Sequence, residues 1–290
     1  MANTVNEKTF TLERPDGARL AAYHWSAGKA KAVVVVAHGM GEHARRYPPA
    51  LAQLLDNGFD LYGIDHRGHG ETMALCNTEA GEFGGGGFAS VVTDLFSLVR
   101  LARKENPGLP LILLGHSMGS FISQAFAIDY SESIDALVLV GTTAVDQLAE
   151  SVKLESDILS ALNRGFEPAR TSCDWLSADE KEVDAYIDDP LCGFSLNLES
   201  MASLLSQGAR LACSIELDKI RKSLPVYVVV GSLDPLGGRF GSVSSVVERY
   251  RSAGLAPTFV SYPQGRHEIL NEVNRGEVVR NLLGWLEYVV

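Results

Sequence analysis

The first part of the chain alternates apolar and polar residues, whereas the later apolar runs are continuous. Residues 9–12 and 19–23 flank the turn sequence Pro15-Asp16-Gly17, and this arrangement predicts a β-hairpin. Beyond the hairpin, short and mostly β-branched apolar runs alternate with helical stretches. Continuous runs of this kind are typical of strands that are buried on both faces of a parallel sheet.

The alternation of strands and helices predicts a doubly wound α/β sheet with right-handed crossovers. The expected strands after the hairpin are residues 33–36, 59–64, 111–114, 136–140, 226–230 and 258–262. The expected helices beside them are residues 49–57, 88–104, 120–130 and 277–288.

The alternation stops between about residues 142 and 223. Apolar spacing predicts helices at residues 146–162 and 198–211, and Pro168 and Pro190 interrupt the stretch. We expect an all-helical insertion above the sheet edge. The alternative is that a weak strand lies hidden in this stretch.

The predicted organisation is one α/β core with one insertion. Residues 1–141 and 224–290 would form the core, and residues 142–223 would form a helical cap. A chain of 290 residues is long enough for such a domain, and an apolar content of 46% is enough for a sizeable core.

The net charge and the cysteines indicate which binding partners and which cellular compartment to expect. The formal net charge of −11 disfavours nucleic acid and anionic lipid headgroups as electrostatic partners. The first 17 residues lack the apolar core of a secretion signal, which predicts a cytoplasmic protein with reduced thiols, although an even cysteine count would permit disulfides. The thiols form no C-x-x-C pair and belong to Cys76, Cys173, Cys192 and Cys213.

Three reactive side chains follow three of the predicted strands. Ser117, Asp234 and His267 each come shortly after an apolar run that reads as a strand. In an open parallel sheet, ligands meet the loops at the carboxyl ends of the strands. We therefore expect these three side chains to lie at the same edge of the sheet.

Ser117 lies at the centre of the sequence Gly-His-Ser-Met-Gly, between a buried strand and a helix. This G-x-S-x-G pattern is that of the nucleophile elbow in α/β-hydrolases. The sharp bend strains the serine backbone, and bulky neighbours would clash with the adjacent strand and helix. The helix that follows points its amide dipoles at the site, which favours developing negative charge.

A serine hydroxyl is a poor nucleophile without a base in hydrogen-bond reach. The chain order Ser117, Asp234, His267 is that of the α/β-hydrolase triad, which favours His267 as the base and Asp234 as the acid. Taken alone, Asp234 could instead be a helix cap or a turn residue. The rival acid is Asp65, and the other histidines near predicted strand ends are His38, His43, His66, His69 and His116.

A tetrahedral intermediate also needs an oxyanion hole. In the template, one N–H comes from the residue after the nucleophile and the other from the loop after the third strand. These positions are Met118 and Met40, and the glycines on both sides of Met40 allow a substrate to approach its backbone closely.

Five motifs together resemble the monoacylglycerol lipase and lysophospholipase group of serine hydrolases. They are HGMGEH at 38–43, DHRGHG at 65–70, GHSMG at 115–119, GSLDP at 231–235 and RHE at 266–268. The resemblance implies an α/β-hydrolase fold with a mostly parallel eight-stranded sheet, helices on both faces and a helical cap. It also implies an acyl-serine intermediate without metal or cofactor, a triad of Ser117, Asp234 and His267, and Met40 and Met118 as oxyanion donors.

Two details qualify the resemblance. The DHRGHG segment is expected to be structural and receives no catalytic role. The acid loop departs from the pattern in carrying the glycine pair Gly237-Gly238, which bears on the shape of the pocket.

The predicted cap is apolar and therefore favours a small apolar ester as substrate, such as a monoacylglycerol or a lysophospholipid. Contact with a membrane surface would be at most transient and through the cap, since no apolar run reaches the roughly 20 residues of a membrane span. An aminopeptidase or thioesterase on the same scaffold and a non-catalytic ligand-binding protein remain alternatives. The apolar cap residues are Leu148, Ile158, Leu159, Leu162, Phe166, Phe194, Leu196, Leu198, Met201, Leu204 and Leu205.

Overall fold

A computed structural model describes residues 5–26, 28–152, 158–237 and 242–290. Eight strands in these ranges form one sheet with the order β1-β2-β4-β3-β5-β6-β7-β8. The expected α/β fold with a mostly parallel eight-stranded sheet is confirmed. The strands are β1 (Asn6–Glu13), β2 (Arg19–Ser26), β3 (Ala32–Ala37), β4 (Phe59–Ile64), β5 (Leu111–His116), β6 (Ala136–Val140), β7 (Val226–Gly231) and β8 (Thr258–Tyr262).

The two kinds of apolar pattern correspond to two kinds of strand pairing. The alternating hairpin strands β1 and β2 pair antiparallel, and β2 also pairs antiparallel with β4. All other neighbours, from β4 through β3 to β8, pair parallel. The strands β3 to β7 are buried along their whole length because helices cover both faces, whereas the edge strand β8 is mostly exposed or half-buried.

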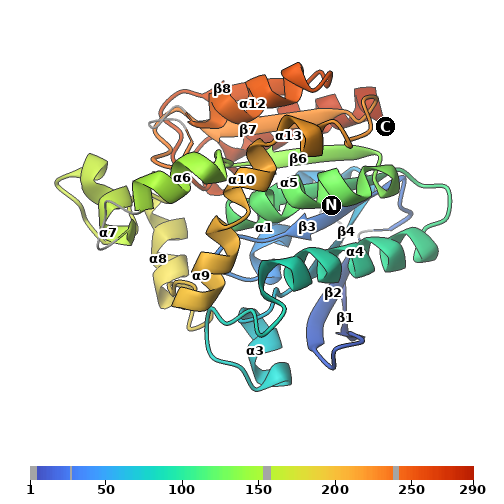
Figure 1. Ribbon diagram of the computed structural model, residues 1–290, viewed down its shortest axis with the longest axis horizontal. Helices are drawn as coiled ribbons and strands as arrows, with labels where there is room; N and C mark the ends of the chain where they lie inside the picture. Colours follow the sequence, from blue (N-terminus) through green and yellow to red (C-terminus); the bar gives the residue numbers. More distant parts are fainter. Residues whose placement is uncertain (1–4, 27, 153–157, 238–241) are drawn as a thin grey trace.

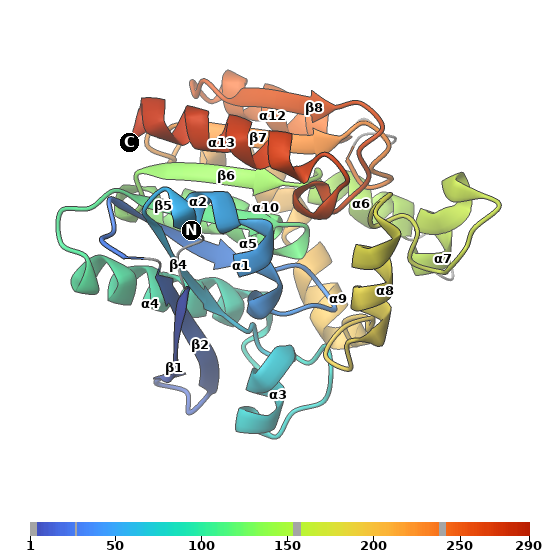
Figure 2. The ribbon, with the colours of Figure 1, turned by 180° about the vertical axis from the view of Figure 1, so that it is seen from behind.

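Helices cover the sheet on both sides (Figures 1 and 2). The helices α4 (Gly87–Glu105), α5 (Met118–Tyr130) and α12 (Ser242–Ser252) pack on one face and share one apolar cluster with it. The short helices α1 (Tyr47–Ala50) and α2 (Ala52–Asp56) pack on the other face with α13 (Arg275–Val289). The predicted helix at residues 49–57 therefore exists as two short pieces.

The stretch between β6 and β7 contains helices and, in its described part, no strand. The helices of this stretch up to residue 188 lie beyond the carboxyl ends of the strands (Figure 2), where the sheet presents its loops. The helices from residue 208 on join the apolar cluster on the face that α5 and α12 cover. The helix expected at residues 146–162 appears as α6 and α7, and residues 153–157 lie outside the described ranges. The helices of this stretch are α6 (Val145–Val152), α7 (Ile158–Asn163), α8 (Glu180–Asp188), α9 (Leu198–Leu205), α10 (Gly208–Ala212) and α11 (Ser214–Leu217).

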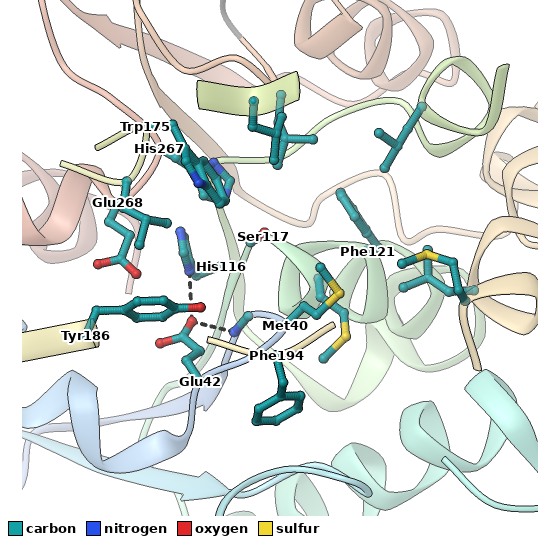
Figure 3. A pocket seen from close by; sticks show the side chains of 18 of the residues that line it. Met40, Glu42, His116, Ser117, Phe121, Trp175, Tyr186, Phe194, His267 and Glu268 are labelled. Carbon is teal, nitrogen blue, oxygen red and sulfur yellow. Dashed lines mark hydrogen bonds and ion pairs between the residues drawn. The ribbon is translucent and has the colours of Figure 1, made fainter. Parts of the chain in front are cut away.

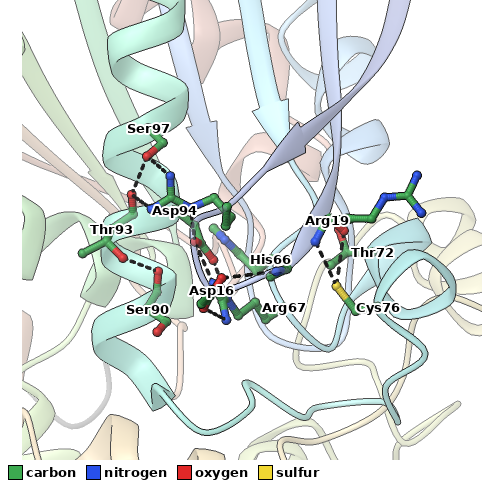
Figure 4. Close-up of polar contacts among 12 residues, drawn as sticks. Asp16, Arg19, His66, Arg67, Thr72, Cys76, Ser90, Thr93, Asp94 and Ser97 are labelled. Carbon is green, nitrogen blue, oxygen red and sulfur yellow. Dashed lines mark hydrogen bonds and ion pairs between the residues drawn. The ribbon is translucent and has the colours of Figure 1, made fainter.

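A buried carboxylate fastens the N-terminal hairpin to the rest of the molecule (Figure 4). Asp94 on α4 accepts from Arg14 Nε at 2.7 Å and from Arg67 Nε at 2.7 Å. Arg67 also pairs with Asp16 in the hairpin turn at 2.7 Å. Arg67 belongs to the loop between β4 and α3 (Gly70–Cys76), so these contacts agree with the structural role expected for the DHRGHG segment.

The helices are too short or too polar to cross a bilayer, as far as the described ranges reach.

Candidate active site

Ser117 occupies a strained bend between β5 and α5. Its backbone has φ 52° and ψ −120°, a conformation that residues other than glycine rarely adopt. The flanking glycines are required by close packing, because a Cβ added at Gly119 would lie 2.0 Å from the Ala37 carbonyl oxygen. A Cβ added at Gly115 would lie 2.3 Å from the oxygen of Gly119. The chain therefore holds the serine out at the start of α5, where the helix dipole favours negative charge.

The loops after β7 and β8 bring Asp234 and His267 together. The Nδ1 atom of His267 lies 3.0 Å from Oδ1 of Asp234, and both side chains are buried. The same carboxylate oxygen accepts the Leu236 N–H at 2.8 Å, which fixes its orientation. The other ring nitrogen, Nε2, has no hydrogen-bond partner among the described residues. Figure 3 places this ring near Ser117 on the wall of one pocket.

The loop after β3 lies directly against the serine. A Cβ added at Gly39 would lie 2.6 Å from Glu42 Oε1 and 3.3 Å from the Cβ of Ser117, so the loop leaves no room for a side chain at this position. The Gly39 N–H donates to Glu42 Oε1 at 2.6 Å, which closes the loop around Met40. Met118 is the first residue of α5, where backbone N–H groups have no acceptor inside the helix. Both expected oxyanion donors therefore stand on the two segments that border Ser117.

A buried ion network lies beneath these loops. The carboxylate of Glu42 meets His116 Nδ1 at 3.0 Å and accepts from Tyr47 at 2.8 Å and from Arg46 at 2.9 Å. Arg46 also donates twice to Glu268, the residue after His267, at 2.6 Å and 2.8 Å. The network thus links the loop after β3, the residue before the serine and the residue after the histidine.

The charges of this network are set by the pairing. Burial alone would raise the pKa of Glu42, but the hydrogen bond with His116 and the charge of Arg46 hold it well below its usual value. Burial alone would lower the pKa of His116, but the hydrogen bond and charge of Glu42 raise it. Glu42 is therefore a carboxylate that orients its donors.

The stretch between β6 and β7, called the inserted stretch below, contacts the loop that carries His267. The His267 N–H donates to the Trp175 carbonyl at 3.3 Å, and the Glu268 N–H donates to the Leu176 carbonyl at 2.7 Å. The Trp175 ring lies 5.0 Å from the His267 ring, between ring centroids. Sequence reasoning missed Trp175, because nothing in the local pattern marks it. It assigned no role to Glu42 or Glu268, although both adjoin the quoted motifs.

A single pocket joins these parts, and its wall is mostly apolar (Figure 3). Ser117, His267, Met40 and Met118 all line it. The expected cap residues that line it are Leu148, Leu162, Phe194, Met201, Leu204 and Leu205.

The other described residues expected to belong to the cap are not among those that line the pocket. Leu196 packs into the main core, and Phe166 lies under the guanidinium of Arg266. Leu198 is 91% exposed. The side chains of Ile158 and Leu159 fall outside what the structure describes, as does Gly238 of the glycine pair.

The rival acid and bases are engaged elsewhere. Asp65 accepts from Tyr23 at 2.7 Å, from the Ala44 N–H at 2.9 Å and from the Glu71 N–H at 2.9 Å. His38 accepts the His66 N–H at 2.9 Å in a buried cluster that includes His69. His43 pairs with Asp189, and His116 pairs with Glu42.

The fold and the pocket define an α/β-hydrolase. Residues 28–274 match the serine aminopeptidase S33 family, and the chain belongs to that family. A monoacylglycerol lipase of Mycolicibacterium smegmatis is 30% identical over 260 residues, which cover 88% of each chain. The mouse monoglyceride lipase is 32% identical over 232 residues, covering 78% of this chain and 73% of its own.

A solved structure agrees with these relatives. A thermostable carboxyl esterase from Bacillus coagulans, in complex with glycerol, superimposes with a TM-score of 0.87 at 26% identity and covers 99% of both chains. Family, relatives and fold together make this chain a carboxylic ester hydrolase of the serine type.

Proposed function

We propose that the chain hydrolyses carboxylic esters of small lipids, of the monoacylglycerol or lysophospholipid kind, with Ser117, Asp234 and His267 as its triad. The observation that carries the proposal is the 3.0 Å contact between His267 and Asp234 behind a serine with φ 52°. Serine and histidine line one apolar pocket, as a shared proton transfer requires.

The chemistry proceeds in two halves. His267 takes the proton of Ser117 as Oγ attacks the ester carbonyl, and Asp234 stabilises the imidazolium. The backbone N–H groups of Met40 and Met118 bind the oxyanion. The leaving alcohol takes the proton from His267, and an acyl group remains on Ser117. Water then attacks the acyl carbon as it loses a proton to His267, and His267 passes that proton to Ser117 Oγ as the bond to the acyl group breaks and the fatty acid leaves.

The two carboxylates at the pocket are already hydrogen-bonded within the protein, which favours an ester substrate over a peptide with a free amine. An aminopeptidase needs an anionic group for the substrate's ammonium, and Glu42 and Glu268 are the acidic residues on the wall near Ser117. Both are already committed, Glu42 to four donors and Glu268 to Arg46 and Asn271. An apolar acyl chain instead gains about 0.8 kcal/mol for each CH₂ that it buries against the wall.

The test is hydrolysis of a panel by purified protein: a monoacylglycerol, a lysophosphatidylcholine, p-nitrophenyl esters, an acyl thioester and amino-acyl p-nitroanilides. We expect turnover of the glyceryl and p-nitrophenyl esters and little of the anilides. Ser117→Ala should lower turnover by roughly 10⁶, because the covalent step is lost.

Ser133→Ala, which removes a hydroxyl that donates to the nearby Tyr130 carbonyl, is the matched control and should keep full activity. Preferred cleavage of anilides would favour the aminopeptidase, and preferred cleavage of thioesters would favour the thioesterase. Binding of the lipid without turnover would favour the non-catalytic reading.

Residues 142–223 act as the cap over the pocket, supported by the helices that contribute to its wall. Transient contact with a membrane surface through the cap is supported by the exposed Leu198. A cytoplasmic location is supported by four cysteines that are all free thiols.

A further inference from the structure

Three metal-ligating side chains meet outside the pocket wall. His43 ends the HGMGEH motif after β3, whereas Asp189 and Cys192 follow α8 in the inserted stretch. The Nε2 atom of His43 lies 2.9 Å from Oδ2 of Asp189. An imidazole nitrogen, a carboxylate oxygen and the Cys192 sulfur all lie within 4.8 Å of one another.

The backbone fixes this meeting. The Gly193 N–H donates to the Gly41 carbonyl at 3.0 Å, two residues before His43 in the chain. A Cβ added at Gly41, where φ is 65°, would lie 2.3 Å from the Phe194 carbonyl oxygen, so the two segments touch. The second oxygen of Asp189 accepts the Leu191 N–H at 2.8 Å, which turns Oδ2 toward the imidazole.

The surroundings suit a cation. Burial raises the pKa of the Cys192 thiol; the charge of Arg46 lowers it, whereas those of Glu42, Asp189 and Glu268 raise it. The carboxylates near the sulfur would stabilise a bound divalent cation.

We propose that His43, Asp189 and Cys192 bind Zn²⁺, with water as the fourth ligand, and so fasten residues 189–194 of the inserted stretch to the loop 38–43. A thiolate, an imidazole and a carboxylate form a ligand set that zinc accepts, and one open position is usual beside three protein ligands. Tetrahedral bonds of roughly 2.0–2.3 Å place ligand atoms about 3.3–3.7 Å apart. The imidazole and carboxylate atoms, now 2.9 Å apart, would therefore move slightly apart, and the sulfur, which lies within 4.8 Å of both, would move closer.

The binding step balances with one proton. The Cys192 thiol loses its proton to solvent as the sulfur–zinc bond forms. The His43 imidazole binds through the Nε2 lone pair, and its N–H is then the one at Nδ1. Asp189 binds as the carboxylate that it already is.

The site adjoins the proposed catalytic machinery on both sides. Met40 lies three residues before His43, and Phe194, which lines the pocket, lies two residues after Cys192. A zinc ion would pin the two segments together and hinder the movement of the inserted stretch that a lipid needs to enter. Zinc should therefore inhibit hydrolysis reversibly, a consequence that rests on the proposed function.

The test is titration of the purified chain with ZnCl₂ by calorimetry and with CoCl₂ by absorption. We expect one zinc per chain, release of one proton, and a sulfur-to-cobalt charge-transfer band. Cys192→Ser should abolish the band and weaken zinc binding by about 100-fold or more, and Asp189→Asn should weaken it while keeping the band. Cys173→Ser, which removes another partly buried thiol, is the matched control and should change neither.

Ser117→Ala separates the two proposals, because it should bind zinc as the unaltered chain does even though it lacks activity. The site is overturned if the unaltered chain shows no band, or if Cys192→Ser binds zinc equally well. Zinc that binds at Cys192 without lowering ester hydrolysis, measured in an active chain, overturns the link to the pocket alone.

Discussion

Glu42 shows at the residue scale how one buried carboxylate can position several of the proposed catalytic groups. It binds the Gly39 N–H beside Met40 and meets His116 beside Ser117. Through Arg46 it is joined to Glu268, beside His267. It touches none of the reacting atoms, so its contribution to catalysis would come through the geometry of its neighbours.

We predict that Glu42→Gln lowers kcat by roughly 10- to 100-fold and changes KM much less, because a shift of about 1 Å in a catalytic group costs up to about 10² in rate. Steady-state kinetics with a p-nitrophenyl ester measures both constants. Glu248→Gln, on an exposed residue paired only with Arg251, is the control. A folded Glu42→Gln variant with unaltered kcat would show that the loop holds its shape without this carboxylate.

Some residues of the site can be predicted from a local sequence motif, and others can be found only in the structure. Ser117 and the oxyanion positions stand in motifs whose spacing and strand context are visible along the chain. Trp175 supports His267 from about 90 residues away through a carbonyl group, and its side chain identity does not encode that contact. Such non-local backbone contacts cannot be read from a pattern.

At the scale of elements, the N-terminal hairpin depends on the Asp94 ion pairs. Its first strand sits at the sheet edge, and Arg14 in its turn reaches α4. The Asp94 side chain is 1% exposed, so its charge is taken from water and offset by Arg14 and Arg67. A buried pair of this kind is costly to break, because the remaining partner keeps an uncompensated charge.

Asp94→Asn should lower the free energy of unfolding by about 3 kcal/mol. Urea denaturation followed by circular dichroism measures the change. The matched control is Glu287→Gln, whose pair with Lys31 is about half exposed on both sides, and it should cost less than about 1 kcal/mol. Equal effects of the two substitutions would mean that the Asp94 network does not anchor the hairpin.

Strands were easier to predict than helices. The strands β4, β6 and β8 have the predicted bounds, because short runs rich in apolar and aromatic residues mark them in the sequence. The helix α8 has the sequence EKEVDAYID, in which only Val183 and Tyr186 are buried, so its apolar stripe is too narrow to stand out. The helix expected at 49–57 breaks at Leu51, whose φ −103° and ψ 19° leave the helical region.

At the scale of the whole molecule, a cluster of buried neutral histidines should set the acid stability. Burial lowers the pKa of His66 to about 3 and that of His69 to about 4, and it lowers the pKa of His38 well below its usual value. In the unfolded chain the pKa of each of these histidines is about 6.5. Between that pH and about 4, the unfolded state binds protons that the folded state does not.

The free energy of unfolding should therefore fall as the pH drops below about 6.5, by up to about 1.4 kcal/mol per pH unit for each such histidine. Urea titrations at pH 7, 6 and 5 measure this slope. His69→Gln should flatten it, whereas His24→Gln, on a partly exposed ring paired with Asp60, serves as the control. A stability that stays constant from pH 7 to pH 5 would contradict the neutral cluster.

If the proposed mechanism holds, folding makes one serine of the whole chain a nucleophile. Reaction with a fluorophosphonate probe, followed by peptide mass spectrometry to locate the adduct, tests this directly. We expect a single adduct on Ser117, none in Ser117→Ala, and labelling at least about 10²-fold slower in His267→Gln. An unlabelled chain, an adduct on another residue, or unchanged labelling of His267→Gln would contradict it.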